Sequence, residues 1–325
     1  MSEKVSRRNF IKGAAMAGLA VSALPLVGLN EVNARDIAER PIQEGNNGKQ
    51  ALPAATHAGK LIVAVGDDPK KLTVEALTAF GGIGQFVKRG DVVMIKPNIG
   101  WNRKPEQAAN TNPLVVGALV ELCKNAGAKK VKVFDNSVNK PRIAYKRSGI
   151  EEAVKQAGGS ITYPNRRKFK EVAFPEGDLL KKWPVYEDVL DVDVLINVPI
   201  AKHHNLTRLT LAMKNLMGVL GGVRGDIHRQ IDEKLADINT RIKPQLIVMD
   251  AYRILTANGP NGGTPEDVKL TKQLIVGADP VAIDSYSATL FGLTGEDLGY
   301  VRIGHERGLG EIDLQKVDIQ RIQVA

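Results

Sequence analysis

The sequence predicts an α/β fold: a mostly parallel mixed sheet with helices on both faces and a ligand crevice at the carboxyl ends of the strands. The first observation is that, from Lys60 onward, short continuous apolar runs alternate with longer segments of helical length. Such alternation is typical of parallel strands that are covered on both faces. The second observation is that polar side chains follow directly after several of these runs. Open α/β sheets bind their ligands at that edge.

The strands are expected where the apolar runs are short and rich in branched residues. These runs span 61–65, 92–95, 131–134, 194–198, 246–249, 274–276 and 317–324. The first five are mostly apolar along their whole length, as expected of strands buried on both faces. The last two complete a mixed sheet.

The helices are expected in the longer segments between these strands. They span 72–89, 113–126, 149–157, 206–220 and 281–291. The segment 206–220 carries apolar residues at helical spacing, which leaves Thr207, Thr210 and Lys214 on a second face at i, i+3 and i+7. Residues 81–84 lie within the first of these segments and are read as a helix-ending turn.

Residues 159–190 break the alternation of strands and helices. The pairs Tyr163-Pro164, Phe174-Pro175 and Trp183-Pro184 fall within them. Proline is confined to edge strands, strand starts and bulges. We therefore expect an irregular or antiparallel insertion within a single domain that spans 60–325.

The N-terminal residues 1–34 are predicted to be a twin-arginine signal peptide. The twin arginines are Arg7 and Arg8, and a small-residue apolar run spans 13–29. This run is too short and too rich in glycine and serine for a spanning helix, which needs ~20 apolar residues. An N-terminal anchor or amphipathic start helix is the alternative. Residues 35–59 have no sustained apolar period and are read as a linker.

The signal peptide implies a periplasmic or exported protein that folds before it crosses the membrane. Its partner in that step is the twin-arginine export machinery, and membrane contact is expected only during export.

The net charge and the cysteine content indicate which classes of ligand and cofactor fit this chain. The formal net charge is +9, but the charges are scattered rather than gathered in a basic stripe with aromatic residues. The sequence therefore gives no indication of nucleic-acid binding and leaves a small anionic ligand or a solvated basic surface. Cys123 is the one cysteine, so this chain alone builds no iron–sulfur cluster, all-cysteine zinc site or internal disulfide.

Four groups of polar residues follow expected strands. They begin at Lys96 with Asn98, at Asp135, at Lys202 with His203 and His204, and at Asp250. Because the carboxyl ends of parallel strands meet at one edge, the four groups are predicted to converge on one crevice. The expected start of the helix 206–220 adds unpaired N–H groups, which hold phosphate or carboxylate. The alternative is that Lys214 only solvates that helix and Asn205 only caps it.

Two kinds of chemistry fit these residues. His204 is a candidate general acid or base, with Lys96, Lys202 or Lys214 fixing an anionic group and Asp250 orienting the imidazole. His204 with Asp135 and Asp250 is a candidate ligand set for a divalent metal. The catalytic candidates are therefore His204, Lys96 and Asp250. The ligand-binding candidates are Asn98, Lys202, Thr207, Thr210, Lys214 and Asn215.

Two aspartates in the C-terminal part of the chain are candidates for a structural or a functional role. Asp279 precedes Pro280 and is expected to cap the helix 281–291. Asp284, one turn later, is expected to turn back toward the site. Residues 258–265 are either a flap over the crevice or a plain solvent loop.

Three motifs in this order carry a resemblance to a known family. They are Ile95-Lys96-Pro97-Asn98, Lys202-His203-His204 with Thr210 and Lys214-Asn215-Leu216-Met217-Gly218, and residues 277–284. Together they resemble the domain of unknown function 362 family, from about Lys60 to the C-terminus. In that family the histidine motif is Lys-any-His, so the resemblance favours Lys202 and His204 over His203. Some members append a cysteine-rich cluster domain, which this chain lacks, and the family implies no reaction.

The sequence thus leaves several functions open. The first hypothesis is an exported enzyme that acts on a small anionic substrate, with a divalent metal or an organic cofactor. One alternative is a periplasmic binding or delivery protein for an anionic ligand or metal complex. Another is an accessory partner of a membrane redox complex.

Overall fold

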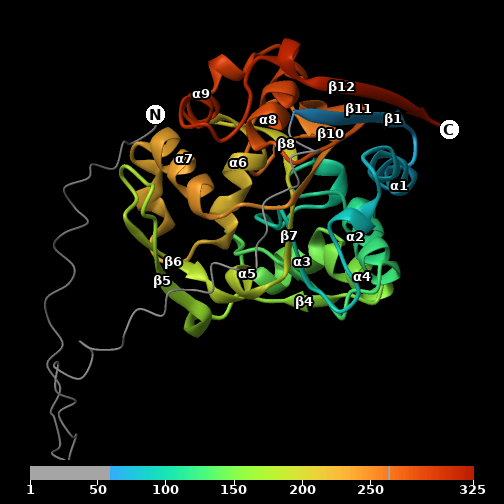
Figure 1. The fold of residues 1–325 in the computed structure, drawn as a ribbon, viewed down its shortest axis with the longest axis horizontal. Coiled ribbons are helices and arrows are strands. Elements are labelled where there is room, and N and C mark those ends of the chain that lie inside the picture. The colour runs from blue at the N-terminus through green and yellow to red at the C-terminus, as the bar shows by residue number, and fades with distance from the viewer. Residues whose placement is uncertain (1–58, 263) are drawn as a thin grey trace, which may run out of the picture. The chain divides into compact units, whose positions relative to one another are not determined.

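A ten-stranded mixed sheet forms the centre of this computed structural model, which describes residues 59–262 and 264–325. The strands lie in the order β12-β1-β11-β10-β7-β2-β3-β4, and β8 pairs with β10 and carries β9 (Figure 1). They are β1 (Lys60–Gly66), β2 (Val92–Pro97), β3 (Lys130–Phe134), β4 (Ser160–Thr162), β7 (Val194–Val198), β8 (Ile200–His204), β9 (Arg208–Thr210), β10 (Leu246–Leu255), β11 (Val268–Gly277) and β12 (Asp318–Val324). The predicted signal peptide with Arg7 and Arg8, and residues 35–58 of the predicted linker, lie outside the described residues.

Most strand pairs are parallel. β4, β3, β2, β7 and β10 pair in parallel, as do β10 with β8 and β1 with β12. β11 is antiparallel to both of its neighbours, and β9 is antiparallel to β8. The predicted fold class, α/β with a mostly parallel mixed sheet, is confirmed.

Helices cover both faces of the sheet, and each face has its own apolar cluster. One face packs against α1 (Pro69–Ala79), α2 (Pro113–Asn125), α3 (Pro141–Arg147) and α4 (Ile150–Gln156). The other packs against α6 (Ala212–Asn215), α7 (Ile231–Arg241), α8 (Pro280–Thr289) and α9 (Gly299–Glu306) (Figure 1). α1, α2 and α8 each begin with proline after a side-chain N-cap, namely Asp68, Asn112 and Asp279. The predicted cap at Asp279 is therefore confirmed.

The first predicted helix is too long. α1 ends at Ala79, because Gly81 and Gly82 adopt positive φ angles of 108° and 85°, which a helix does not accommodate. The predicted turn at 81–84 is present and leads into a short 3₁₀ turn, Ile83–Gln85.

The predicted helix over 206–220 is wrong. Its first part is the turn and second strand of a hairpin, in which Lys202 of β8 lies opposite Thr210 of β9. Arg208 has a φ of 59°, outside the right-handed helical region. Residues 209–213 are all buried, and the pairing of β9 with β8 replaces the helical pattern in the first part of the segment. Only the four residues of α6 and the 3₁₀ turn Leu216–Val219 are helical here.

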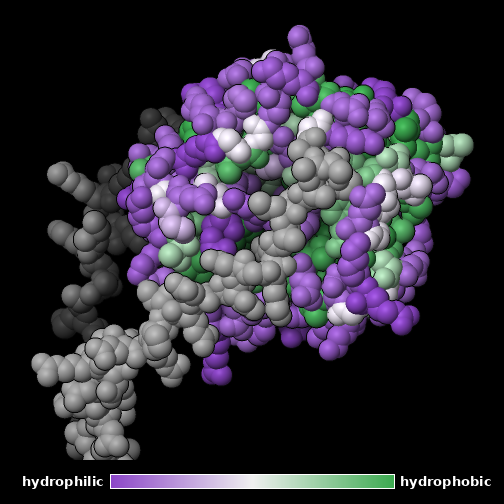
Figure 2. Space-filling model, viewed as in Figure 1, coloured by the Kyte–Doolittle hydropathy of each residue, from purple (hydrophilic) through white to green (hydrophobic). Residues whose placement is uncertain are grey.

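Residues 159–190 contribute to two sheets. β4 extends the main sheet beside β3, whereas β5 (Phe169–Ala173) and β6 (Lys182–Tyr186) form a separate antiparallel pair before α5 (Glu187–Asp191). None of the helices in the described part of the chain is long and apolar enough to cross a membrane. Figure 2 shows one face of the molecule. On this face, hydrophilic residues cover most of the described surface, and hydrophobic residues are scattered between them.

Candidate functional site

A cavity of about 650 Å³ opens where β2, β3 and β8 end. Eight of the predicted site residues line it: Lys96, Asn98, Asp135, Lys202, His204, Thr210, Lys214 and Asn215. Strand ends, the β8–β9 hairpin and α6 therefore bring together side chains that are more than a hundred positions apart in the sequence.

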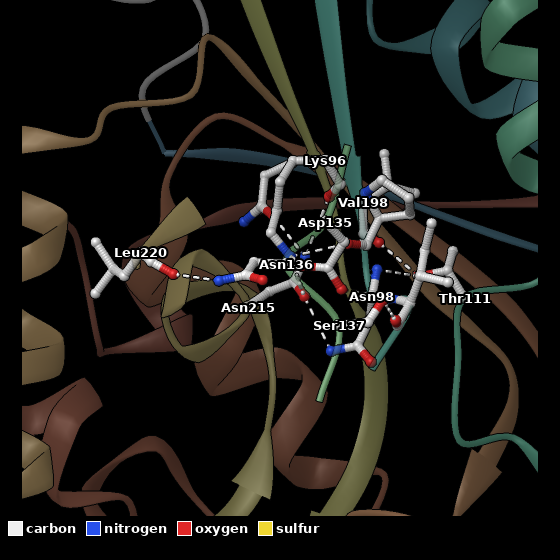
Figure 3. A network of polar contacts seen from close by, with 12 residues as sticks. Lys96, Asn98, Thr111, Asp135, Asn136, Ser137, Val198, Asn215 and Leu220 are labelled. Atoms are coloured by element: carbon white, nitrogen blue, oxygen red, sulfur yellow. Dashed lines mark hydrogen bonds and ion pairs between the residues drawn. The ribbon is translucent and has the colours of Figure 1, made fainter. Parts of the chain in front are cut away.

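A buried ion pair forms the floor of the cavity (Figure 3). The Lys96 Nζ lies 2.8 Å from Asp135 Oδ1, and both side chains are almost fully buried. Asp135 Oδ2 accepts a hydrogen bond from the backbone N–H of Ile99 at 2.6 Å. Burial lowers the pKa of Lys96, and the Asp135 carboxylate partly offsets that effect. Because Asp135 neutralises Lys96, this pair brings no net charge to the cavity.

Asn215 ties the ion pair to two strands. Its Oδ1 accepts hydrogen bonds from Lys96 Nζ at 3.1 Å and from Asn98 Nδ2 at 3.0 Å. Its Nδ2 donates to Asn197 Oδ1 at 2.8 Å and to the Lys96 carbonyl at 3.2 Å. All its amide groups are thus engaged, so Asn215 holds the floor rigidly in place.

Gly218 lies directly against the ion pair. A Cβ at this position would overlap Asp135 Oδ1 and lie 2.5 Å from Lys96 Nζ. The Gly218 carbonyl also accepts a hydrogen bond from Asn136 N at 2.8 Å. The glycine of the motif 214–218 is therefore required by close packing on charged atoms.

Lys202 and Lys214 are two cations of the cavity that form no ion pair with a carboxylate of the described residues. Lys202 Nζ donates to the Ala109 carbonyl at 2.6 Å and to Asn98 Oδ1 at 3.0 Å, and Lys214 Nζ contacts Met217 Sδ at 3.4 Å. No carboxylate of residues 59–262 or 264–325 forms an ion pair with either ammonium. Burial lowers the pKa of Lys202 to about 7 and that of Lys214 to about 8.

His204 presents one ring nitrogen to its own backbone. Its Nδ1 accepts a hydrogen bond from the N–H of Leu206 at 3.1 Å, which assigns the ring proton to Nε2. Burial, with the charges of Lys214 and Lys202, lowers the pKa of His204 to about 3. The ring is therefore neutral at pH 7 and suits donation of a hydrogen bond better than the predicted acid–base role. His203 instead accepts from Gly259 N at 3.1 Å.

Arg224 is a cavity residue that the sequence did not reveal. It lies in the 3₁₀ turn Arg224–His228, lines the cavity, and donates to the carbonyls of Asn136 at 2.6 Å and Ser137 at 3.1 Å. No ion pair joins Arg224 to a carboxylate of the described chain. A single arginine among glycines has no periodic pattern, so the segment gave no signal beyond its charge.

Asp250 does not belong to the cavity, which corrects its predicted roles. β10 continues to Leu255, so Asp250 lies within the strand rather than at its end. Its carboxylate accepts hydrogen bonds from Asn112 N at 2.8 Å and Tyr252 N at 3.1 Å. Burial raises the pKa of Asp250 to about 6. Asp250 supports the start of α2 and does not orient His204.

Two more predicted site roles differ from what the structure shows, namely the metal ligand set and Thr207 as a ligand-binding residue. The described residues contain no group of three His, Cys, Asp or Glu side chains that could hold a metal ion, so His204, Asp135 and Asp250 are not brought together as a ligand set. The Thr207 hydroxyl donates to the Leu209 carbonyl at 2.9 Å inside the hairpin, and Thr207 is absent from the cavity lining. Pro260 of the predicted flap does line the cavity.

Asp284 acts through α6 rather than in the cavity, contrary to the prediction. Its two carboxylate oxygens accept hydrogen bonds from Ala212 N at 2.7 Å and Met213 N at 2.9 Å. These are orphan N–H groups at the first turn of α6, two residues before Lys214. Asp284 thus positions the backbone that carries Lys214 and Asn215.

We expect Asp284→Ala to lower the free energy of unfolding by about 1–3 kcal/mol, because two buried N–H groups lose their acceptor. Asp284→Asn keeps one acceptor oxygen and should cost less. Urea denaturation of both variants checks this ranking. Equal stability of the alanine variant and the wild type would show that water or other groups accept hydrogen bonds from these N–H groups of α6.

Comparisons with known proteins show which family model and which relative the chain is similar to. A family model described as "Domain of unknown function (DUF362)" matches residues 93–289. The thylakoid-associated protein sll1697 of Synechocystis sp. is 27% identical over 216 residues, which cover 64% of this chain. The alignment covers 65% of that relative, so the chain spans just under two thirds of its length.

Two solved structures show weak similarity. One is a structural-genomics protein from Thermotoga maritima, with a TM-score of 0.38 and 13% identity over 74% of this chain and 60% of that one. The other is the lactate racemase apoprotein from Thermoanaerobacterium thermosaccharolyticum, also with a TM-score of 0.38 and 13% identity, over 69% and 55%. Neither similarity is close enough to argue from.

Proposed function

Because this chain belongs to the DUF362 family, whose description states no activity, we propose its function from the cavity: it is an enzyme that binds a small organic anion and exchanges a proton with it. The observation that carries this proposal is a set of three cations, Lys202, Lys214 and Arg224, around one cavity. Only neutral acceptors pair with them among the described residues.

The charge balance favours an anionic ligand. Asp135 is already paired with Lys96, and no carboxylate of the described residues forms an ion pair with the other three cations. A buried cation without a counter-charge costs free energy, and a bound anion removes that cost. The amide of Asn98 and the Nε2–H of His204 add neutral donors to the same wall. The ligand is therefore held by charge and oriented by hydrogen bonds.

Lys202 is the residue that we propose for proton transfer. Its pKa of about 7 lets it give or accept a proton near neutral pH. Lys214 and Arg224 then hold the anionic group, while Asn98 keeps the Lys202 ammonium in place at 3.0 Å. Lys202 and Lys214 are each charged below their pKa values.

We expect Lys214→Met to weaken sulfate binding by about 10- to 100-fold, the usual value of a charge-assisted hydrogen bond. Wild-type affinity should be highest near pH 6 and fall as the pH rises through the pKa values of Lys202 and Lys214, about 7 and 8. Sulfate keeps its charge over this range, so calorimetry reports the protein's titration. Lys155→Met, at an exposed lysine on α4, is the control.

Turnover is tested with small carboxylates and phosphate esters in D₂O. Deuterium incorporation that Lys202→Met abolishes would support the enzyme. Anion binding without incorporation into any compound would instead favour the binding or delivery protein. Sulfate affinity that is unchanged by Lys214→Met would contradict the anion site itself.

We also propose that the chain is exported by the twin-arginine route. The support is sequence alone: Arg7 and Arg8 precede a small-residue apolar run over 13–29. The proposal suits a cavity assembled from distant segments, because such a site forms only when the whole chain has folded.

We expect the double substitution Arg7→Lys and Arg8→Lys to abolish export of the full chain from a bacterium with this pathway, leaving precursor in the cytoplasm. Lys4→Arg is the matched control and should leave export unchanged. Fractionation followed by immunoblotting measures both. Retention of the wild-type protein in the membrane fraction would favour an N-terminal anchor.

A further inference from the structure

The cavity has an apolar mouth as well as buried cations. Val138 and Leu206 line it and are 59% and 62% exposed. These are two of the seven large hydrophobic residues that the described part of the chain exposes most. Exposed apolar side chains that gather at one opening mark a binding surface.

The exposed apolar residues that line the mouth come from two separate segments: Val138 follows β3, and Leu206 lies in the turn between β8 and β9. Trp101 and Met217 extend the apolar lining from two further segments. Because the folded chain brings these positions together from distant parts of the sequence, no single loop explains the exposed patch.

The charges lie deeper than the apolar residues. Lys202 and Lys214 are 1% and 6% exposed, against 59% or more for Val138 and Leu206. Arg224 donates to the carbonyls of Asn136 and Ser137, the two residues before Val138. A ligand that fits this order has a compact anionic head at the floor and an apolar body at the mouth.

The number of cations favours a doubly charged head. Lys202, Lys214 and Arg224 have no carboxylate partner within the described chain. A phosphate monoester carries a charge of about −1.5 to −2 at pH 7 and three acceptor oxygens, whereas a carboxylate carries a single charge. A phosphate therefore compensates these cations more fully.

We propose that the ligand of this cavity is an amphipathic phosphate monoester, bound as a single dissolved molecule with its phosphate among Lys202, Lys214 and Arg224. Its apolar body then covers Val138 and Leu206. The cavity, at about 650 Å³, has the size that encloses a whole small ligand. This inference rests on the proposed function, because it names the substrate class of the same site.

The test is calorimetry with methyl, butyl and octyl phosphate, each below its aggregation concentration. We expect affinity to rise about three- to fourfold for each added methylene until the mouth is covered. Leu206→Ser should flatten this dependence on chain length. Leu270→Ser, at an exposed leucine on β11, is the matched control and should leave the dependence as in the wild type.

Each of the other possible outcomes would refute one specific part of the proposal. Equal affinity for the three phosphates would refute the apolar subsite while leaving the proposed anion-binding function intact. Tighter binding of octanoate than of octyl phosphate would refute the phosphate class. Lys214-dependent binding to phosphatidic acid vesicles, without binding of dissolved octyl phosphate, would refute the dissolved ligand. Failure to bind any anion, sulfate included, would refute the proposed function itself.

Discussion

Replacement of Asp135 by alanine is expected to lower the free energy of unfolding by about 3–5 kcal/mol, because it leaves the buried Lys96 ammonium without a counter-charge. The two side chains are 4% and 1% exposed, so water cannot replace the lost carboxylate without entering the floor of the cavity. The Ile99 N–H loses its acceptor at the same time. Urea denaturation at pH 7 measures the change.

A double-mutant cycle separates the ion pair from general damage at this position. Lys96→Met alone should also destabilise, because it leaves the Asp135 carboxylate buried and unpaired. The double variant removes both charges and should be more stable than the sum of the two single effects predicts. Additive effects of the two substitutions, or a loss below about 1 kcal/mol for Asp135→Ala, would show that the pair contributes little.

The strands were predictable because their signal is local. β7, for instance, is apolar except for Asn197 and is buried along its whole length, and the predicted 194–198 matches it. β10 began as predicted but continued to Leu255, where its pairing with β11 extends the strand. Pairing partners are distant in sequence, so the start of a buried strand is easier to predict than its end.

The segment 206–220 could not be predicted by pattern alone. Its apolar residues satisfy a helical period, and Leu209, Leu211 and Met213 also satisfy a strand period. The structure resolves the ambiguity through β8, which supplies backbone partners for β9. Leu206, counted in the helical stripe, is instead exposed at the cavity mouth.

The site was predicted best where motifs follow strand ends. Lys96, Asp135 and His204 were each predicted to follow a strand, and they meet in one cavity at the ends of β2, β3 and β8. The prediction that Asp250 belongs to the site was wrong because its strand continues past this residue. Arg224 was missed because its segment has no regular period. Local pattern thus identifies candidate side chains, and the tertiary fold decides which of them share a site.

Gly218→Ala is the second substitution with a large expected effect, since the added methyl group would overlap Asp135 Oδ1. Overpacking of a tight interior costs about 1–3 kcal/mol, and separation of a buried ion pair adds to it. We expect a total loss of about 3–5 kcal/mol in the free energy of unfolding and no measurable sulfate binding. Gly84→Ala, where a Cβ meets open space, is the control.

The two substitutions should be coupled, because they act on the same pair of atoms. In the double variant of Gly218→Ala and Asp135→Ala, the carboxylate that the new methyl group would strike is absent. The methyl group then meets only the end of the flexible Lys96 side chain, which can move aside. We therefore expect the double variant to be no less stable than Asp135→Ala alone. Fully additive losses would mean that contact with the ion pair does not explain the glycine at position 218.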